Sequence, residues 1–332
     1  MLNFSLIICT YQRPKSLLLL LESVKKQSVY PNEILIIDGS LNDETKLIVS
    51  ENDFANLKYH KVSESDRGLT KQRNFGVKKV SNTSEIVCFL DDDTVLENNY
   101  FEKIIETYQK FPDAIGVGGV ARNENNWKLN TQNLITNSKF FVLDGYYVKE
   151  SSRNYLRNLL GLNATGLSGN MPEFSHGRTF SYPLNDKIYP VDLLIGMSMS
   201  FRKSVFDKIN FSEYFEGYGL YEDADFSIKA SKFGQNYVAT SAILNHFHDS
   251  AGRPNQYKYG KMVIRNGYYV WRLKYPNPSF SAKSKWLLIN LLLLTIRFVN
   301  VFTTKKRKAS LQESVGRIVG LLSLIFNKPK KQ

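Results

Sequence analysis

Three consecutive carboxylates, Asp91-Asp92-Asp93, follow directly on the apolar residues 86–90. An apolar run rich in β-branched and aromatic residues predicts a buried strand, and three adjacent anions at its end repel one another unless a positive charge lies among them. Hard oxygen ligands at this spacing suit Mg²⁺ or Mn²⁺, which complete their shells with water and the phosphates of a nucleotide. The triplet therefore predicts a divalent-cation site, with a solvated acidic turn before the helix near Glu97 as the alternative.

A second pair of acids, Glu222-Asp223, lies in the first turn of a helix predicted over residues 220–233. Acids favour helix N-termini through the helix dipole, so capping explains the pair when it is taken alone. A carboxylate within hydrogen-bond reach of a hydroxyl can also accept its proton at neutral pH. Behind an aspartate triplet and a nucleotide-type sheet, the second interpretation is favoured.

Two of the four histidines, His246 and His248, stand just after a strand predicted over residues 237–244. The pair is as compatible with a structural role as with a metal site. Imidazole suits Mn²⁺ better than Mg²⁺. A zinc site made of histidines alone is not favoured, because no third soft ligand lies near in the sequence.

The elements that must position these residues alternate between strand-like and helix-like runs over the first half of the chain. The predicted strands cover residues 4–9, 33–37, 57–62, 86–90 and 114–120, and the predicted helices cover 15–27, 41–51, 68–80 and 97–111. This alternation predicts an α/β fold with a mostly parallel, doubly wound sheet flanked by helices. Ligands bind such sheets at the carboxyl ends of the strands, where Thr10, Asp38 and the aspartate triplet lie.

The positive charge of the chain is concentrated at one end. The 332 residues carry a net charge of +13, yet residues 253–332 hold 17 of the 44 lysines and arginines and a single acid, Glu313. Such asymmetry predicts an anionic partner for that segment only. Its long apolar stretches and the near-neutral remainder favour a phospholipid surface, and no nucleic acid is expected.

Two amphipathic helices are predicted in this basic segment. Residues 286–302 are mostly apolar, with a narrow polar stripe that contains Asn290, Arg297, Asn300 and Thr304. The uninterrupted apolar run is shorter than the roughly 20 residues that cross a bilayer, and Arg297 would be costly at its centre. A second amphipathic pattern follows the basic residues 305–308. The two patterns predict association with a membrane surface through residues 283–332, with packing on the protein's own core or on another subunit as the alternative.

Taken together, residues 5–250 resemble the family 2 glycosyltransferases with the GT-A nucleotide-sugar fold. Several motifs in the right order carry this resemblance. They are residues 7–14 as the opening strand and turn, Ile36-Ile37-Asp38-Gly39-Ser40, the helix that contains Gln72-Arg73-Asn74-Phe75-Gly76 with glutamine where alanine is usual, the aspartate triplet, residues 196–202, and Glu222-Asp223.

The resemblance implies an inverting, metal-dependent enzyme that moves a sugar from a nucleotide-diphosphate donor, with UDP favoured over dTDP or GDP. The acceptor is expected to be a glycan or a lipid-linked glycan in cell-surface polysaccharide or glycoconjugate synthesis, and the cofactor Mn²⁺ or Mg²⁺. Asp223 is expected to be the catalytic base, beside Glu222. The expected metal ligands are Asp91, Asp93 and His246, with His248 as runner-up. The residues expected at the donor are Thr10, Tyr11, Arg13, Asp38, Arg73, Asn74, Asp91 and Asp92.

The resemblance also divides the chain. A glycosyltransferase domain is expected over residues 1–252, followed by a helical, membrane-associating region at 253–332. The domain is expected to have a nucleotide-sugar half (1–120) and an acceptor half (121–252). Within the acceptor half, residues 145–190 are expected to form a long loop or insertion. The chain does not begin with the charged segment, short apolar run and cleavage site that together mark a signal peptide. A cytoplasmic protein that is peripheral on the inner face of the membrane is therefore expected. The sequence leaves open whether the protein forms a homo-oligomer.

Two other functions are weighed against this one. A sugar nucleotidylyltransferase would need a glycine-rich phosphate loop after the first strand, and residues 10–14 contain no glycine. A non-catalytic, membrane-bound relative is disfavoured because Asp93 and Asp223 are both present.

Overall fold

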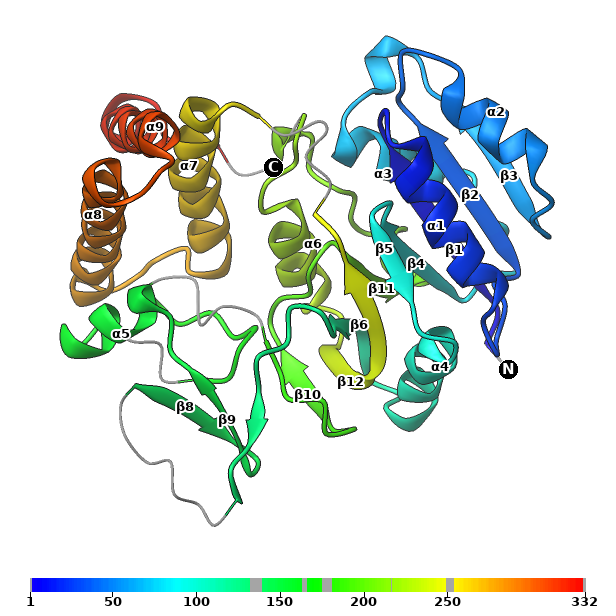
Figure 1. The fold of residues 1–332 in the computed structure, drawn as a ribbon, viewed down its shortest axis with the longest axis horizontal. Helices are drawn as coiled ribbons and strands as arrows, with labels where there is room; N and C mark the ends of the chain where they lie inside the picture. Colours follow the sequence, from blue (N-terminus) through cyan, green and yellow to red (C-terminus); the bar gives the residue numbers. More distant parts are fainter. Residues whose placement is uncertain are drawn as a thin grey trace. The chain divides into compact units, whose positions relative to one another are not determined.

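A computed structural model describes residues 2–131, 139–162, 166–174, 181–215, 217–248 and 254–330 (Figure 1). Contacts divide the chain into two compact units. Unit 1 comprises residues 1–125 and 184–253, and unit 2 comprises residues 126–183 and 254–332. The domain boundaries expected from the sequence stay a prediction, although the contacts group residues 126–183 with the C-terminal segment.

Unit 1 is built on a mixed nine-stranded sheet. Its N-terminal strands are β1 (Phe4–Thr10), β2 (Glu33–Asp38), β3 (Leu57–Lys61) and β4 (Ile86–Asp91), which pair in parallel in the order β4-β1-β2-β3. Its other strands are β5 (Thr94–Leu96), β6 (Ala114–Ala121), β10 (Ile188–Val191), β11 (Ser198–Arg202) and β12 (Gln235–His246). Strand β11 lies antiparallel between β4 and β6, while β12 runs parallel to β6 and antiparallel to β5 and β10. The predicted α/β class is confirmed, and the predicted parallel arrangement describes the N-terminal half.

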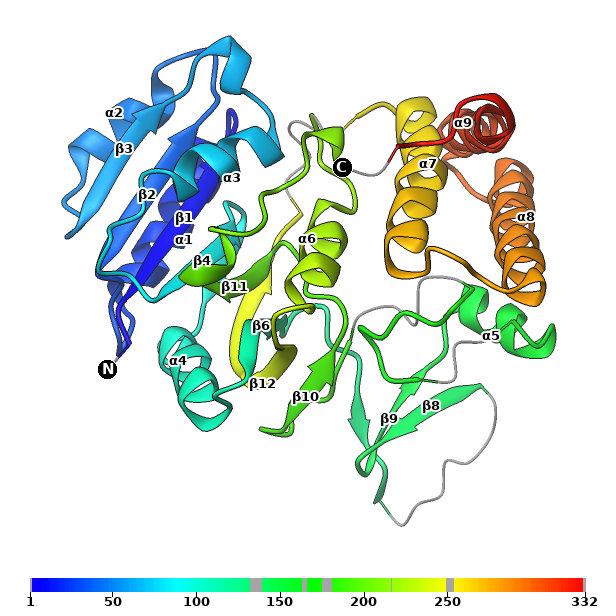
Figure 2. The same ribbon diagram turned by 180° about the vertical axis from the view of Figure 1, so that it is seen from behind.

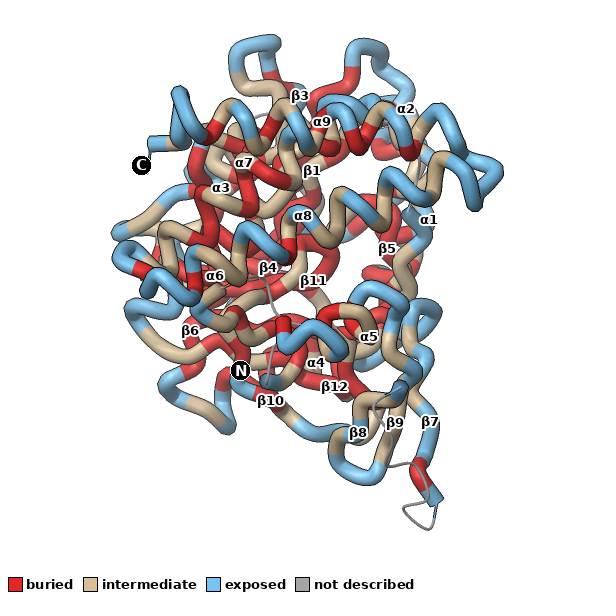
Figure 3. Tube along the Cα trace, turned by 90° about the vertical axis from the view of Figure 1, so that its left-hand side faces the viewer, coloured by how far each residue is buried: buried red, intermediate tan, exposed pale blue. Residues whose placement is uncertain are grey.

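Helices flank this sheet, and α1 and α3 lie on opposite faces of it (Figures 1 and 2). The helices of unit 1 are α1 (Pro14–Lys25), α2 (Glu44–Glu51), α3 (Leu69–Val77), α4 (Tyr100–Lys110) and α6 (Glu222–Ala230). Helix α1 begins at Pro14, whose fixed φ suits the first helical position, and it buries Leu17, Leu20, Leu21 and Val24. Buried residues follow the strands of the sheet in Figure 3, and many of their apolar side chains belong to one core cluster beneath the strand ends.

Unit 2 contains elements that the sequence did not reveal. A small sheet has the order β7 (Lys128–Leu129), β9 (Tyr146–Lys149), β8 (Phe140–Leu143), and helix α5 covers Ser152–Leu159. The prediction of a long loop over residues 145–190 is therefore wrong in part, since this range contains β9, α5 and most of β10; its residues 163–165 and 175–180 lie outside the described part. Short strands carry little periodicity, and α5 depends on a local cap in which Ser151 accepts from the backbone of Asn154.

The C-terminal part of unit 2 consists of α7 (Gln256–Lys274), α8 (Phe280–Thr303) and α9 (Arg307–Phe326). Helices α7 and α9 approach closely through glycines, because a Cβ at Gly260 or Gly316 would overlap a backbone carbonyl of the other helix. Helix α8 begins six residues before the predicted start. By length and composition, both α8 and α9 could cross a membrane.

Candidate active site

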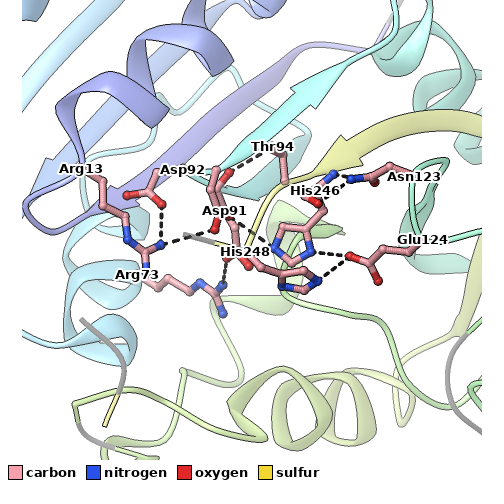
Figure 4. A network of polar contacts seen from close by, with 10 residues as sticks. Arg13, Arg73, Asp91, Asp92, Thr94, Asn123, Glu124, His246 and His248 are labelled. Atoms are coloured by element: carbon pink, nitrogen blue, oxygen red, sulfur yellow. Dashed lines mark hydrogen bonds and ion pairs between the residues drawn. The ribbon is translucent and has the colours of Figure 1, made fainter. Parts of the chain in front are cut away.

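The aspartate triplet lies where β4 ends, beside the end of β1 (Figure 4). Asp92 turns toward β1, where Thr10 Oγ1 donates to its Oδ2 at 2.7 Å and Arg13 Nη1 donates to its Oδ1 at 2.9 Å. Burial raises the pKa of Asp92 to about 7, and Arg13 opposes this shift. The side chain of Asp92 is therefore held by hydrogen bonds from Thr10 and Arg13, two residues that were expected at the donor.

Asp91 and Asp93 form a different group with His246. Their carboxylate oxygens and an imidazole nitrogen all lie within 4.8 Å of one another, and His246 Nε2 is 3.3 Å from Asp93 Oδ1. Burial raises the pKa of Asp91, which a nearby cation would counter. Two hard oxygens and one imidazole nitrogen are a donor set that suits Mn²⁺, and Mg²⁺ less well. The residues present therefore fit a divalent cation.

His246 is held in place by the end of β6. Its Nδ1 lies 2.9 Å from Glu124 Oε1, and its backbone exchanges two hydrogen bonds with the side chain of Asn123, at 3.0 and 2.7 Å. Burial lowers the pKa of His246, but the contacts with Asp93 and Glu124 outweigh it and raise the pKa to about 10. His248 contacts Glu124 Oε1 through Nε2 at 2.8 Å. Sequence reasoning missed Glu124, although its place just after a predicted strand was a usable signal.

Arg73 joins the triplet to the later acids. Its Nη1 donates to Glu222 Oε1, and its Nη2 lies 3.6 Å from Asp91 Oδ1. Arg73 is 2% exposed and Glu222 4%. Burial raises the pKa of Glu222, and the guanidinium opposes this. Acids more than 130 residues apart in the chain thus meet around one buried guanidinium.

Asp223 occupies the neighbouring position at the start of α6. Its Oδ2 accepts from the backbone N–H of Gly196 at 3.0 Å, and its Oδ1 accepts from that of Ala224 at 2.8 Å. Burial raises the pKa of Asp223, and the two N–H groups oppose the shift. A side chain at Gly196 would put Cβ 3.2 Å from Arg73 Nη2 and 3.4 Å from Glu222 Oε1. Glycine therefore lets the chain pass close to these charged groups.

The remaining expected donor residues have different surroundings. Asp38 is fully buried, where its Oδ1 accepts from the backbone of Ser40 at 2.8 Å and its Oδ2 from the hydroxyl of Tyr59 at 2.7 Å. Asn74 exchanges two hydrogen bonds with the backbone of Phe211, at 2.9 and 3.0 Å, so its side chain is engaged with the chain itself. Tyr11 is half-buried in the bend after β1.

Comparison with known proteins gives one family. The model of the family described as "Glycosyl transferase family 2" matches residues 5–208. The curated relatives include a glucosyl-dolichyl phosphate glucuronosyltransferase of Haloferax volcanii, 29% identical over 121 residues, and the O-antigen chain rhamnosyltransferase RfbN of Salmonella typhimurium, 27% identical over 118 residues. Each alignment covers 36% of this chain and spans only 38% and 37% of the two relatives.

Solved structures share the fold. The S. aureus TarS 1–349 structure matches with a TM-score of 0.55 at 14% identity, covering 98% of this chain and 81% of that one. The mannosyltransferase PcManGT from Pyrobaculum calidifontis, solved in complex with GDP-Man and Mn²⁺, matches with a TM-score of 0.56 at 11% identity, covering 98% of this chain and 88% of that one. At these identities the likeness concerns the fold alone, and it confirms the expected GT-A architecture.

Proposed function

This chain belongs to glycosyl transferase family 2, and from that premise we propose that it is an inverting, metal-dependent enzyme that moves a sugar from a nucleoside-diphosphate donor, with UDP favoured, to a glycan or lipid-linked acceptor. The observation that carries the proposal is the meeting of Asp91 and Glu222 at the buried guanidinium of Arg73. This contact supports a single site in which the expected metal ligands and the expected base, Asp223 beside Glu222, would act together.

On the donor side, Asp91, Asp93 and His246 would hold the cation. When bound, Mn²⁺ or Mg²⁺ stabilises the negative charge of the departing diphosphate. Thr10 and Arg13 hold Asp92 beside this position. Tyr11, in the bend after β1, would contact the nucleoside, whereas Asp38 at the end of β2 is fully buried with both oxygens bonded and would shape this part of the site from within.

On the acceptor side, Asp223 would take the proton of the attacking hydroxyl. The two backbone N–H groups that contact its carboxylate favour the ionised form that a base needs. Glu222 is bonded to Arg73 and is placed to hold the start of α6 rather than to take the proton. Among the described residues we assign one base and no nucleophile to the proposed site, which supports single displacement with inversion.

Asp223→Asn and Asp93→Asn separate the two roles. We expect Asp223→Asn to lower turnover by about two to four orders of magnitude while nucleotide binding persists, and Asp93→Asn to weaken Mn²⁺-dependent donor binding. A thermal-shift screen of UDP-, GDP- and dTDP-sugars with Mn²⁺ identifies the donor, and nucleotide release measures turnover. Asp43→Asn, at an exposed carboxylate, is the control. Near-normal turnover of Asp223→Asn would exclude it as the base.

We further propose that α8 and α9 bind the inner surface of an anionic membrane, near a lipid-linked acceptor. Both helices expose large apolar side chains, namely Phe280, Leu287, Leu288, Leu291, Phe298, Val299, Phe302, Leu311, Val315, Ile318, Leu322, Ile325 and Phe326. The single acid of the segment, Glu313, is 2% exposed and bonded to Arg297 and Arg317. The exposed charges are therefore positive. The relative named for a dolichyl phosphate substrate supports a lipid-linked acceptor.

Both helices are expected to lie in the plane of the membrane. If α8 crossed the bilayer, the basic residues 305–308 would have to reach the far side, against the usual distribution of positive charge. Arg297 lies inside α8 and is bonded to Glu313 of α9, which also suits an interfacial position better than a lipid-facing one.

Vesicle flotation tests this surface. Phe302→Ser combined with Phe326→Ser, and separately replacement of residues 305–308 by glutamine, should each reduce binding to phosphatidylglycerol vesicles. Leu41→Ser, at an exposed leucine of unit 1, is the matched control and should bind as the wild type does. Unchanged flotation of both test variants would exclude this membrane surface.

A further inference from the structure

The imidazole of His246 is fixed by its surroundings. Asn123 bonds to both the N–H and the carbonyl of His246, and the next residue, Phe247, donates its N–H to the carbonyl of Asp93 at 3.0 Å. The side chain of His246 is 12% exposed. With its backbone clamped on two sides, the ring presents one nitrogen to the aspartates and the other to Glu124 (Figure 4).

The two ring nitrogens cannot do the same task. A neutral imidazole has one nitrogen that accepts or ligates and one that carries a proton. Nε2 lies 3.3 Å from Asp93 Oδ1, within the group that would hold a cation, so it must be the nitrogen without a proton when it ligates. Nδ1 must then donate, and a carboxylate oxygen of Glu124 lies 2.9 Å away to accept.

We propose that Glu124 is a positioning residue for the metal site, which fixes the Nδ1–H tautomer of His246 and the direction of its Nε2. This inference rests on the proposed function, because it requires a cation at Asp91, Asp93 and His246. Acceptors behind a ligating histidine orient the ring and increase its basicity. Glu124 thus controls affinity for the cation without touching it.

His248 extends the chain of contacts outward. Its Nε2 lies 2.8 Å from the same Oε1 of Glu124, its ring centroid is 4.0 Å from that of His246, and its side chain is 52% exposed. His248 therefore holds Glu124 from the solvent side and acts on the cation only through it. The order of contacts from solvent to site is His248, Glu124, His246, Asp93.

The inference also predicts a preference between cations. Mn²⁺ accepts imidazole readily, whereas Mg²⁺ relies on oxygen ligands and water. Misplacing the imidazole should therefore reduce the affinity for Mn²⁺ more than the affinity for Mg²⁺. A general loss of folding would lower both affinities together.

Titration of the purified full chain with Mn²⁺ alone, followed by the electron paramagnetic resonance signal of free Mn²⁺, tests the proposal without an activity readout. Glu124→Ala should weaken Mn²⁺ binding by about 10- to 100-fold, and Glu124→Gln, whose amide oxygen can still accept, should weaken it less. His248→Ala should also weaken it less than Glu124→Ala. In turnover assays, Glu124→Ala should need a higher Mn²⁺ concentration for half-maximal rate. At saturating Mn²⁺, the variant should reach most of the wild-type kcat.

Glu97→Gln is the matched control, because it removes a nearby carboxylate that bonds to Arg122 at 2.9 Å and contacts no histidine in the described part of the chain. It should bind Mn²⁺ as the wild type does. If the Mn²⁺ affinity of Glu124→Ala stays within about twofold of the wild type, the positioning role of Glu124 is overturned, while the proposed function is not. A larger loss in His248→Ala than in Glu124→Ala also overturns this role, since His248 would then act directly. A wild type that does not bind Mn²⁺ overturns the metal site of the proposed function as well.

Discussion

Arg73 and Glu222 form a buried contact, and removing either side chain should lower the free energy of unfolding. The loss should be larger when Arg73 is replaced than when Glu222 is replaced. With 2% and 4% of the two side chains exposed, Arg73→Met leaves a carboxylate buried without its counter-ion. Removing one partner of such a pair costs about 3–5 kcal/mol of unfolding free energy. For a unit of this size, the expected fall in Tm is roughly 6–20 °C.

Glu222→Gln should cost less, because Arg73 keeps other partners. Its Nη2 stays 3.6 Å from Asp91, and its guanidinium carbon lies 5.8 and 5.3 Å from the ring centroids of Phe89 and Phe211. A glutamine oxygen can also still accept from Nη1. The expected cost is about 1–3 kcal/mol.

The loss in Arg73→Met should depend on pH in a definite direction. Burial already raises the pKa of Glu222, and the guanidinium is what opposes the shift. Without Arg73 the folded state holds the proton of Glu222 to still higher pH. A raised folded pKa stabilises the fold below the unfolded pKa and loses that contribution as the pH rises through the folded pKa, which is about 8 for Glu222 in the wild type. The deficit of the variant should therefore stay constant up to about pH 7 and grow above about pH 8, where only the wild type ionises Glu222.

Urea unfolding of metal-free protein, followed by far-UV circular dichroism, measures these differences. The Arg73→Met/Glu222→Gln double variant should be more stable than the sum of the single losses predicts, by about 1–3 kcal/mol. Additive losses within about 0.5 kcal/mol, or a pH-independent penalty for Arg73→Met, would show that the pair does not stabilise the site as argued.

Three other predictions concern separate parts of the molecule. Because the pKa of Asp92 is raised to about 7, metal-free wild type should lose up to about 1.4 kcal/mol per pH unit relative to Asp92→Asn between pH 4 and 7; a constant difference in urea unfolding would contradict this. Gly316→Ala should lower the midpoint of unfolding of unit 2, seen by fluorescence since all three tryptophans lie there, whereas Gly166→Ala, whose Cβ would meet only an atom 3.9 Å away, should not. Tyr59→Phe removes a hydrogen bond to buried Asp38 and should cost about 1–3 kcal/mol, measured as a lower Tm than that of the wild type.

The sequence predicts the N-terminal half of the fold well, because its signals are local. Each of β1, β2 and β4 is an apolar run next to a helical pattern, and alternation alone implies parallel pairing. The antiparallel insertion of β11 between β4 and β6 has no local signal, since it is decided by which strands pair. Helix α7 was not predicted as a separate helix, because two of its buried positions, Gly260 and Gly267, carry no apolar side chain, and Gly260 instead brings the backbone close to α9.

From the sequence, Asp91 and Asp93 were expected at the metal and Asp91 and Asp92 at the donor, and in the structure the three carboxylates have different partners. Strand β4 ends at Asp91, and Asp92 and Asp93 lie in the turn before β5, so the alternation of a strand does not decide where their side chains point. Asp92 accepts from Thr10 and Arg13, Arg13 Nη1 also lies 3.6 Å from Asp93 Oδ2, and Asp91 and Asp93 lie beside His246. The residue types were readable from the sequence, but the partners of each carboxylate depend on the turn that follows β4.

Glu124 shows why part of a site stays hidden in a sequence even when its chemistry is common. Strands β6 and β12 pair in parallel with Ala121 opposite Leu244, so continuing the register brings Asn123 beside His246 and Glu124 just beyond it. Given this pairing, a carboxylate behind the histidine follows from the register alone. Without it, the two residues are 122 positions apart and nothing local connects them. The outer contact of the proposed metal site therefore depends on strand pairing, whereas its proposed ligands could be suggested from residue type and spacing alone.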